Sequence, residues 1–454
     1  MKNTKPTGRT LDMTKGSPMK LLFTFALPLF LGNLLQQFYN LADTSIAGHL
    51  LGDAALAQIG ATSALYSLIT NFAFGLNNGL ALNVSRSFGA GDKKEMKRSV
   101  CWMVTLAFIS ALVMTVGFLL FRKPLLTVMQ TPEDVLDGAL SYFTVILAGI
   151  PLTMAYNLES ALLQSMGNSV TPLGFLLFSS ILNVILDFFF IGNPLNLGVQ
   201  GAAAATVLSQ GLSAALGFLY ILKNYPEIRF GRKDWKVPGK FVTEMFWTGL
   251  SMALMSAIYN LGSVILQSSI NALGSVYIAA QVGGRKLAEF FYIPGIALGT
   301  SAATFSSQNF GAGERARIAK GARSGIFMYF CWWLVALVFV IFLAPTAVKF
   351  ITGSSNPEVI KNGVLYLRIS IPMIPPMAIL VILRNILQGM RRPGMPLFCS
   401  CLELIGKVIF AFWLVPAFGY VAVCVCEPVT WVICCVVIAV AVFAIRGEFT
   451  DRHI

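Results

Sequence analysis

Apolar residues fill this 454-residue chain in long continuous runs, which short polar stretches separate. A helix needs about 20 mostly apolar residues to cross a membrane, whereas the strands of a membrane barrel would alternate polar and apolar residues over about 10 positions. The runs therefore predict an all-α polytopic membrane protein with twelve transmembrane helices. The expected spans are roughly 18–47, 54–84, 99–121, 138–165, 171–192, 198–222, 242–270, 276–307, 323–344, 362–388, 396–415 and 420–445.

The composition excludes several other classes of protein. Hydrophobic residues make up 56% of the chain and charged residues only 12%, whereas a soluble domain carries about 25% charged residues. A single water-soluble core, a disordered chain, a collagen and a small disulfide scaffold are all inconsistent with these values.

The positive charges are distributed unequally between alternate loops. The N-terminal tail, the loops after the second, sixth, eighth and tenth spans, and the C-terminal tail hold 24 of the 33 Lys and Arg residues. The other loops hold only Arg122, Lys123, Lys349 and Lys361. Cytoplasmic loops carry such an excess, so we expect a plasma (inner) membrane protein with both termini in the cytoplasm. This topology explains the net charge of +13 without nucleic acid as a partner.

The chain repeats itself after about half its length. Residues 85–92 resemble 307–314 at an offset of 222, and residues 162–172 resemble 386–396 at an offset of 224. Each half holds six spans, an even number, so both halves start on the same side of the membrane and the repeats are parallel. We expect an N-terminal lobe over 1–222, a cytoplasmic linker over 223–240 and a C-terminal lobe over 241–454.

No catalytic constellation is visible. The only histidines are His49 and His453, the eight cysteines show no metal-ligand spacing, and no phosphate-binding loop occurs. The sequence therefore predicts a secondary transporter that is driven by an ion gradient, with no enzyme activity and no cofactor.

Acidic residues inside a span are costly, and each is a functional hypothesis. Asp43 and Asp187 lie at similar outer depths in spans 1 and 5. Apart from Lys20 at the start of span 1, no Lys or Arg lies in these spans or in span 4. Asn183 precedes Asp187 by one helical turn, and Thr206 lies about two turns from the outer end of span 6. Two carboxylates that face one polar pocket are neutralised by a proton or by a monovalent cation such as Na⁺. The alternative is that they touch water at the membrane interface, and Glu159 in span 4 is an equally open case.

The acids of the second half have basic neighbours. Arg285 and Glu289 are four residues apart, as are Glu403 and Lys407, and both spacings predict ion pairs along one helix. Glu427, which Pro428 follows, is expected to lack a nearby partner. The residues expected at a possible cavity are Gln36, Asn40, Glu159, Arg285, Glu289 and Glu427.

Pro28 interrupts the first span fifteen residues before Asp43. A proline inside a membrane helix produces a bend. The bend can act as a hinge that responds to protonation of Asp43, or it can be a static kink.

The sequence resembles the multidrug and toxic compound extrusion (MATE) transporters. The resemblance rests on Asn40–His49 with Leu56–Ala61, on the Phe88-Gly-Ala-Gly91 turn, on Gln164–Pro172, and on the Asn183/Asp187 spacing. It implies a V-shaped pair of six-helix lobes that export organic, often cationic, compounds in exchange for H⁺ or Na⁺.

The resemblance also assigns roles to residues. It places Asp43, Asn183, Asp187 and Thr206 in a first-lobe cation site, adds Tyr142, and makes Pro28 the bending point of span 1. It does not extend to a second-lobe ion site, because span 7 has only Glu244, at its cytoplasmic end.

The preferred interpretation is therefore a cation-coupled antiporter that exports small amphipathic drugs by alternating access, as a monomer in the bilayer. A lipid-linked oligosaccharide flippase of the same superfamily is the alternative. Few cations lie within the spans, which argues against a pyrophosphate-binding cavity. A receptor or an intramembrane enzyme would need a ligand domain or a catalytic set, and neither is visible.

Overall fold

The fold was analysed in a computed structural model that describes residues 10–192 and 195–449. These residues form helices joined by short loops, and no β-strand occurs among them. The expectation of an all-α protein is confirmed. Lys2, Lys5, Arg9, Arg452 and His453, which entered the charge and histidine arguments, lie outside the described residues.

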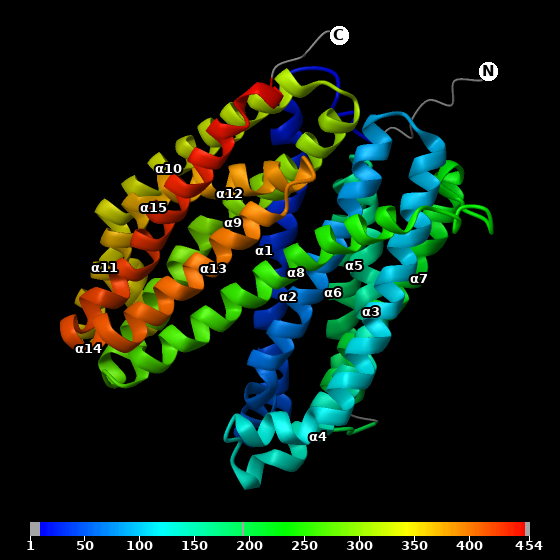
Figure 1. Cartoon of the computed structure of the whole chain (residues 1–454). Helices are drawn as coiled ribbons and strands as arrows, with labels where there is room; N and C mark the ends of the chain where they lie inside the picture. The colour runs from blue at the N-terminus through cyan, green and yellow to red at the C-terminus, as the bar shows by residue number, and fades with distance from the viewer. Residues whose placement is uncertain (1–9, 193–194, 450–454) are drawn as a thin grey trace. The chain divides into compact units, whose positions relative to one another are not determined.

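The helices follow the expected spans in order (Figure 1). The first half comprises α1 (Pro18–Leu51), α2 (Asp53–Gly89), α3 (Lys93–Val128), α4 (Glu133–Ala148), α5 (Ile150–Ser165), α6 (Val170–Ile191), α7 (Val199–Asn224) and the short η1 (Pro226–Ile228). The second half comprises α8 (Gly239–Asn271), α9 (Ser275–Gly311), α10 (Arg315–Thr352), α11 (Pro357–Ser370), η2 (Ile371–Met373), α12 (Ile374–Gly389), α13 (Gly394–Ile409), η3 (Phe410–Leu414), α14 (Val415–Phe418), α15 (Tyr420–Ala444) and η4 (Arg446–Phe449).

Ten helices in the described part of the chain are long and apolar enough to cross a membrane, and an eleventh span results if α4 and α5 count together. The helix outside this set is α9, whose interior carries Arg285, Lys286 and Glu289. The protein is therefore a multi-pass membrane protein, and its helices agree with the twelve expected spans in order and approximate position.

The expected span 138–165 is bent. Helices α4 and α5 meet at 46° around Gly149. Pro151 follows this glycine and has no N–H to continue the hydrogen-bond ladder of α4. The corresponding span of the second half is interrupted in the same place, where η2 separates α11 from α12 just before Pro375.

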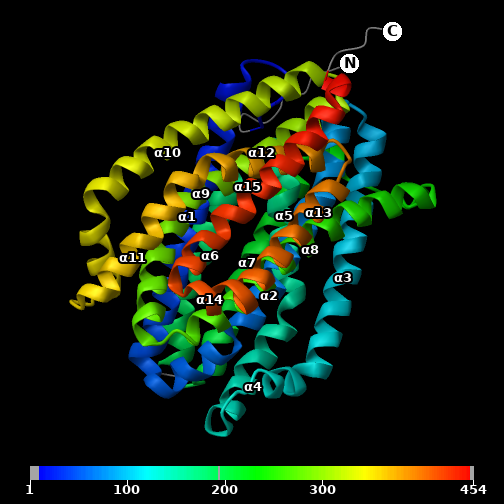
Figure 2. The ribbon, with the colours of Figure 1, turned by 60° about the vertical axis from the view of Figure 1, so that its left-hand side comes forward.

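Contacts divide the chain into two compact units. Unit 1 comprises 1–12 and 31–253, and unit 2 comprises 13–30 and 254–454. In unit 1, α2 packs against α3, α4 and α5, and α6 lies beside α7 (Figure 2). In unit 2, α9 packs against α10, α11 and α12, and α15 packs against α12 and α13. Within each unit the second helix of the repeat, α2 or α9, is thus the central one.

The turns of the two repeats share their hydrogen bonds. After α2, the N–H groups of Ala90 and Asp92 donate to the carbonyls of Arg86 and Ser87. After α9, Ala312 and Glu314 donate in the same way to Gln308 and Asn309, at the offset of 222. Asp92 adds a side-chain cap, because its Oδ1 accepts from the N–H groups of Lys94 and Glu95. The repeat that the sequence predicts is therefore also a repeat of backbone structure.

The turn between α5 and α6 matches the turn between α12 and α13. Gly167 donates to the carbonyl of Gln164, and Arg391 donates to the carbonyl of Gln388, at the offset of 224. Both residues have a positive φ, +85° for Gly167 and +62° for Arg391. A Cβ on Gly167 would meet the carbonyl oxygen of Leu11 at 2.0 Å, so this position requires glycine.

Candidate functional site

Asp43 and Asp187 come together inside unit 1. Helix α1 supplies Asp43 and helix α6 supplies Asp187, and their carboxyl groups lie within hydrogen-bonding reach of each other. The side chain of Asp187 is fully buried. One oxygen of each carboxyl group, Oδ1, has no hydrogen-bond partner among the described residues. Such oxygens are available to a proton or to a small cation.

Asn183 and Thr206 belong to the same cluster. With its amide nitrogen turned toward Asp187, Asn183 donates to Oδ2 of Asp187 at 3.1 Å and accepts from the backbone N–H of Thr206 at 3.2 Å. The hydroxyl of Thr206 donates to the carbonyl of Ala202 at 3.1 Å. The four residues that the sequence selected are thus brought together from α1, α6 and α7.

Tyrosines surround the acidic pair. Tyr142 on α4 is buried and lies within electrostatic range of both Asp43 and Asp187. Tyr39 on α1 lies beside the side chain of Thr206, and Tyr66 on α2 lies beside the side chain of Gln210. Oxygen atoms of carboxylates, hydroxyls and amides are the ligands that a hard monovalent cation prefers. The composition of this cluster therefore fits H⁺ or Na⁺.

Glu159 lies elsewhere in unit 1. It is buried on α5, and its Oε2 occupies the space that a Cβ on Gly217 would need, at 2.1 Å. Tyr156, one turn away on the same helix, lies within electrostatic range of Glu159. No ion pair to Glu159 occurs among the described residues. The structure thus places Glu159 apart from Asp43 and Asp187.

The remaining first-half candidates lie along α1. Gln36 donates from Nε2 to Oδ1 of Asn40 at 3.2 Å, and Asn40 is exposed. Neither has a described hydrogen bond to the acidic pair. Pro28 lies inside α1, and the chain passes from unit 2 to unit 1 three residues later, at residue 31.

An open hollow of about 540 Å³ lies at the end of unit 1 that carries the α1–α2 and α6–α7 turns. Its wall includes Gln58, Asp137, Ser141 and Gln200. Ser141 precedes Tyr142 in the chain, so the hollow adjoins the helix that supplies one side of the acidic cluster.

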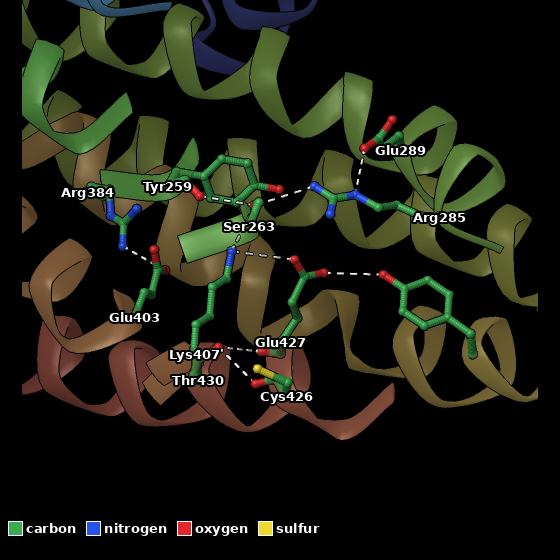
Figure 3. A network of polar contacts seen from close by, with 11 residues as sticks. Tyr259, Ser263, Arg285, Glu289, Arg384, Glu403, Lys407, Cys426, Glu427 and Thr430 are labelled. Carbon is green, nitrogen blue, oxygen red and sulfur yellow. Dashed lines mark hydrogen bonds and ion pairs between the residues drawn. The ribbon is translucent and has the colours of Figure 1, made fainter. Parts of the chain in front are cut away.

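Unit 2 contains a network of charged side chains (Figure 3). Arg285 donates from Nε to Oε1 of Glu289 at 3.0 Å, as the spacing on α9 predicts. Lys407 pairs with Glu427 at 3.7 Å, and Glu427 also accepts from the hydroxyl of Tyr366 at 3.3 Å. The expectation that Glu427 has no nearby partner is therefore wrong.

The expected pair of Glu403 with Lys407 is also wrong. Glu403 binds Arg384 on α12, with 2.9 Å between Oε1 and Nη2. Lys407 instead turns toward α15 and α8, where its ammonium lies 3.3 Å from the hydroxyl of Ser263 and 4.2 Å from the centre of the Tyr259 ring. Lys407 and Glu403 thus each bind side chains of neighbouring helices in place of one another.

Some residues of both clusters cannot be identified as site residues from the sequence of a single span. Tyr39, Tyr66 and Gln210 in unit 1 and Tyr259 and Ser263 in unit 2 are ordinary residues of amphipathic helices when each helix is considered alone. The internal repeat is the signal that finds Tyr259, because Tyr39-Asn40-Leu41 recurs as Tyr259-Asn260-Leu261.

Known proteins resemble this chain along most of its length. The sequence model of the MatE family matches residues 28–189 and 251–413, which together are more than half of the chain. The probable multidrug resistance protein YpnP of Bacillus subtilis is 29% identical over 313 residues, which cover 68% of this chain and 69% of YpnP. The FAD transporter of Shewanella oneidensis is 26% identical over 397 residues and 85% of each protein.

A solved structure has the same fold. A crystal structure described as MATE in the bent conformation superposes with a TM-score of 0.89, at 21% identity, over 98% of this chain and 100% of the other. The family's members are transporters and not enzymes. Two matching segments, one in each repeat, and a common fold lead to one conclusion: the chain belongs to the MatE family of membrane transporters.

Proposed function

We propose that the protein is a cation-coupled antiporter that exports small organic compounds by alternating access. H⁺ or Na⁺ enters the cluster of Asp43, Asn183, Asp187 and Thr206 and is exchanged for the exported compound. The ion is a substrate of the exchange, and no cofactor takes part.

One observation carries the proposal, namely the paired carboxyl groups of Asp43 and Asp187 with one unpartnered oxygen each. Neither Asp43 nor Asp187 forms an ion pair with a basic side chain among the described residues, so no Lys or Arg neutralises them. Two carboxylates within hydrogen-bonding reach of each other in a low-dielectric interior repel each other strongly unless a proton or a cation is bound. Occupation by an external cation is therefore part of the stable state of this site.

The exported compound is a small amphipathic molecule, for which an organic cation is the first choice. YpnP is described as a multidrug resistance protein, and the three interior basic residues of unit 2 (Arg285, Arg384 and Lys407) each pair with a carboxylate. Basic residues that are already neutralised do not favour a pyrophosphate, which argues against a lipid-linked oligosaccharide. The relative described as an FAD transporter makes FAD the second cargo to test.

The deciding experiment measures efflux from proteoliposomes with a proton gradient and a sodium gradient applied separately. We expect one gradient to drive export of an organic cation such as ethidium, and we expect Asp43→Asn and Asp187→Asn each to reduce that export at least tenfold. An amide neither releases a proton at neutral pH nor offers an anionic ligand.

Asp134→Asn is the matched control, because it neutralises an exposed carboxylate at the start of α4 in the same unit. Gradient-driven export that survives in both Asp43→Asn and Asp187→Asn would remove the pair from the mechanism. Export of FAD in place of ethidium would retain the coupling and change the cargo.

A further inference from the structure

The charged network of unit 2 occupies the positions that form the acidic cluster in unit 1. At an offset of 220, Tyr39 and Asp43 correspond to Tyr259 and Ser263. At the offset of 224 that aligns the α5–α6 and α12–α13 turns, the remaining positions correspond as well. These pairs are Tyr142 with Tyr366, Asn183 with Lys407, Asp187 with Ala411, and Thr206 with Thr430.

Local contacts support the correspondence. The hydroxyl of Thr206 donates to the carbonyl of Ala202, and the hydroxyl of Thr430 donates to the carbonyl of Cys426, each at 3.1 Å. Ala202 and Cys426 are themselves 224 positions apart. The two repeats therefore place their threonines in the same way on α7 and α15.

The two clusters differ in their charged side chains. Both acids of unit 1 are missing from unit 2, where Ser263 and Ala411 stand instead, and the neighbour of Ala411, Phe412, is not acidic either. An amide in unit 1, Asn183, is replaced by the ammonium of Lys407, and a new carboxylate, Glu427, faces it. Lys407 and Glu427 thus contribute one positive and one negative charge. Arg285, which pairs with Glu289, adds a guanidinium that donates from Nη2 to the hydroxyl of Ser263 at 3.4 Å.

The ammonium of Lys407 is held as a bound cation would be held. It lies 3.7 Å from the carboxylate of Glu427, 3.3 Å from the hydroxyl of Ser263 and 4.2 Å from the centre of the Tyr259 ring. Lys407 and Glu427 are both buried. A carboxylate, a hydroxyl and the face of an aromatic ring together recognise an organic ammonium ion. We call these three side chains, Tyr259, Ser263 and Glu427, the ammonium box.

The helices of unit 2 make room for the longer side chain. A Cβ on Gly262 would lie 2.8 Å from Cδ of Lys407. The corresponding residue of unit 1 is Ala42, and the residue that corresponds to Lys407 is the shorter Asn183. Glycine at position 262 therefore leaves space for the lysine stem that alanine would partly fill.

We propose that Lys407 is a tethered cation, whose ammonium permanently fills a monovalent-cation site in unit 2 that corresponds to the exchangeable site of unit 1. That the site of unit 1 exchanges its cation rests on the proposed function. The ammonium box of unit 2 does not depend on that function. Removal of the lysine side chain then leaves a site for a small primary ammonium ion. Each chain exchanges its coupling ion in unit 1 alone, because unit 2 carries its own cation.

The test measures binding of methylammonium to the purified full-length chain by thermal unfolding in detergent. The background is Asp43→Asn/Asp187→Asn, so that no ion binds in unit 1 and failure of the proposed function does not affect the result. In Lys407→Ala we expect methylammonium chloride to raise the unfolding midpoint saturably by about 4 °C. Choline chloride at equal ionic strength is too large for the box and should not raise it.

Two variants serve as matched controls. Lys407→Met removes the charge but keeps the stem, so it fills the space and should show no saturable effect. Lys407→Ala/Glu427→Gln opens the space but removes the carboxylate, so methylammonium should lose its effect there as well. Lys407→Asn, which introduces the residue found in unit 1, should respond as Lys407→Ala does.

A methylammonium response that is missing from both Lys407→Ala and Lys407→Asn would overturn the proposal, and so would one that survives Glu427→Gln. If Lys407→Ala accumulates only when methylammonium is present during purification, the proposal is supported. If neither variant accumulates even then, while Lys407→Ala/Glu427→Gln does, the box does not accept a free ammonium ion and the proposal fails.

Discussion

Arg384 and Glu403 form a buried ion pair between α12 and α13. Their side chains are 13% and 12% exposed, and Nε of Arg384 has no hydrogen-bond partner among the described residues. Taking two charges out of water costs several kcal/mol, which their attraction must offset. The pair therefore stabilises the fold only as long as both members are present.

This balance gives a prediction for single and double variants. Arg384→Met leaves an uncompensated buried carboxylate and should destabilise the protein by about 3–5 kcal/mol, whereas Arg384→Met/Glu403→Leu should recover most of that loss. Thermal unfolding in detergent measures both. Lys361→Met is the control, since the Lys361–Glu358 pair is exposed. A double variant as unstable as the single one would contradict the argument.

For single residues, the sequence indicates which side chains are functional candidates more reliably than it indicates their partners. Asp43 and Asp187 could be selected because buried acids without bases are rare. Lys407 was assigned to Glu403 because the i,i+4 rule considers one helix at a time. The partners that Lys407 has in the structure come from α8 and α15, and no spacing along α13 contains them.

Helices α2 and α8 approach closely through glycines. A Cβ on Gly79 would lie 2.6 Å from Cα of Gly249, and a Cβ on Gly75 would lie 2.7 Å from the carbonyl oxygen of Met252. Small residues allow membrane helices to gain packing contacts where the hydrophobic effect contributes little. The first part of α8 is thereby fixed against the central helix of unit 1.

A methyl group at this crossing should force the helices apart. We expect Gly79→Ala to lower stability by about 1–3 kcal/mol, as overpacking does, and to lower the unfolding midpoint accordingly. Gly117→Ala on α3 is the matched control, because a Cβ there meets nothing within 4 Å. Equal midpoints for the two variants would show that the crossing tolerates an added methyl group.

The elements themselves follow from the apolar runs, but their interruptions do not. The break between α4 and α5 lies at Gly149-Ile150-Pro151, and a proline alone does not indicate its angle, since Pro28, Pro124, Pro294 and Pro345 lie inside helices that continue. Hydrogen bonds from neighbouring helices decide between a bend and a break, and one sequence segment does not contain them.

For the whole molecule, the distribution of basic residues predicts the orientation in the membrane. A cysteine at Gly231, in the basic segment after α7, should react with a membrane-impermeant maleimide only from the cytoplasmic side. A cysteine at Ser355, in the turn after α10, should react from the outside in intact cells. Both positions are exposed. The parent chain is the control for the eight native cysteines, and labelling of both positions from one side would contradict the topology.

The repeat could be predicted from short matches in turns, and it organises most of the molecule. The division of contacts is less visible in the sequence: residues 13–30 of α1 pack within unit 2, and α8 up to residue 253 packs within unit 1. The sequence predicts a cytoplasmic linker at 223–240, between the two repeats. Contacts of a helix end depend on where its neighbours lie, and the linear order of spans does not contain that information.

Arg391 takes the place of Gly167 in the second copy of one turn and keeps its left-handed backbone, at a φ of +62°. A side chain in this conformation costs about 1 kcal/mol or more, so the surrounding hydrogen bonds preserve the turn against the preference of the residue itself. The two copies of the turn thus share their backbone geometry although the side chains at this position differ. A left-handed residue at this point of the turn therefore marks the internal repeat better than the amino acid that occupies it.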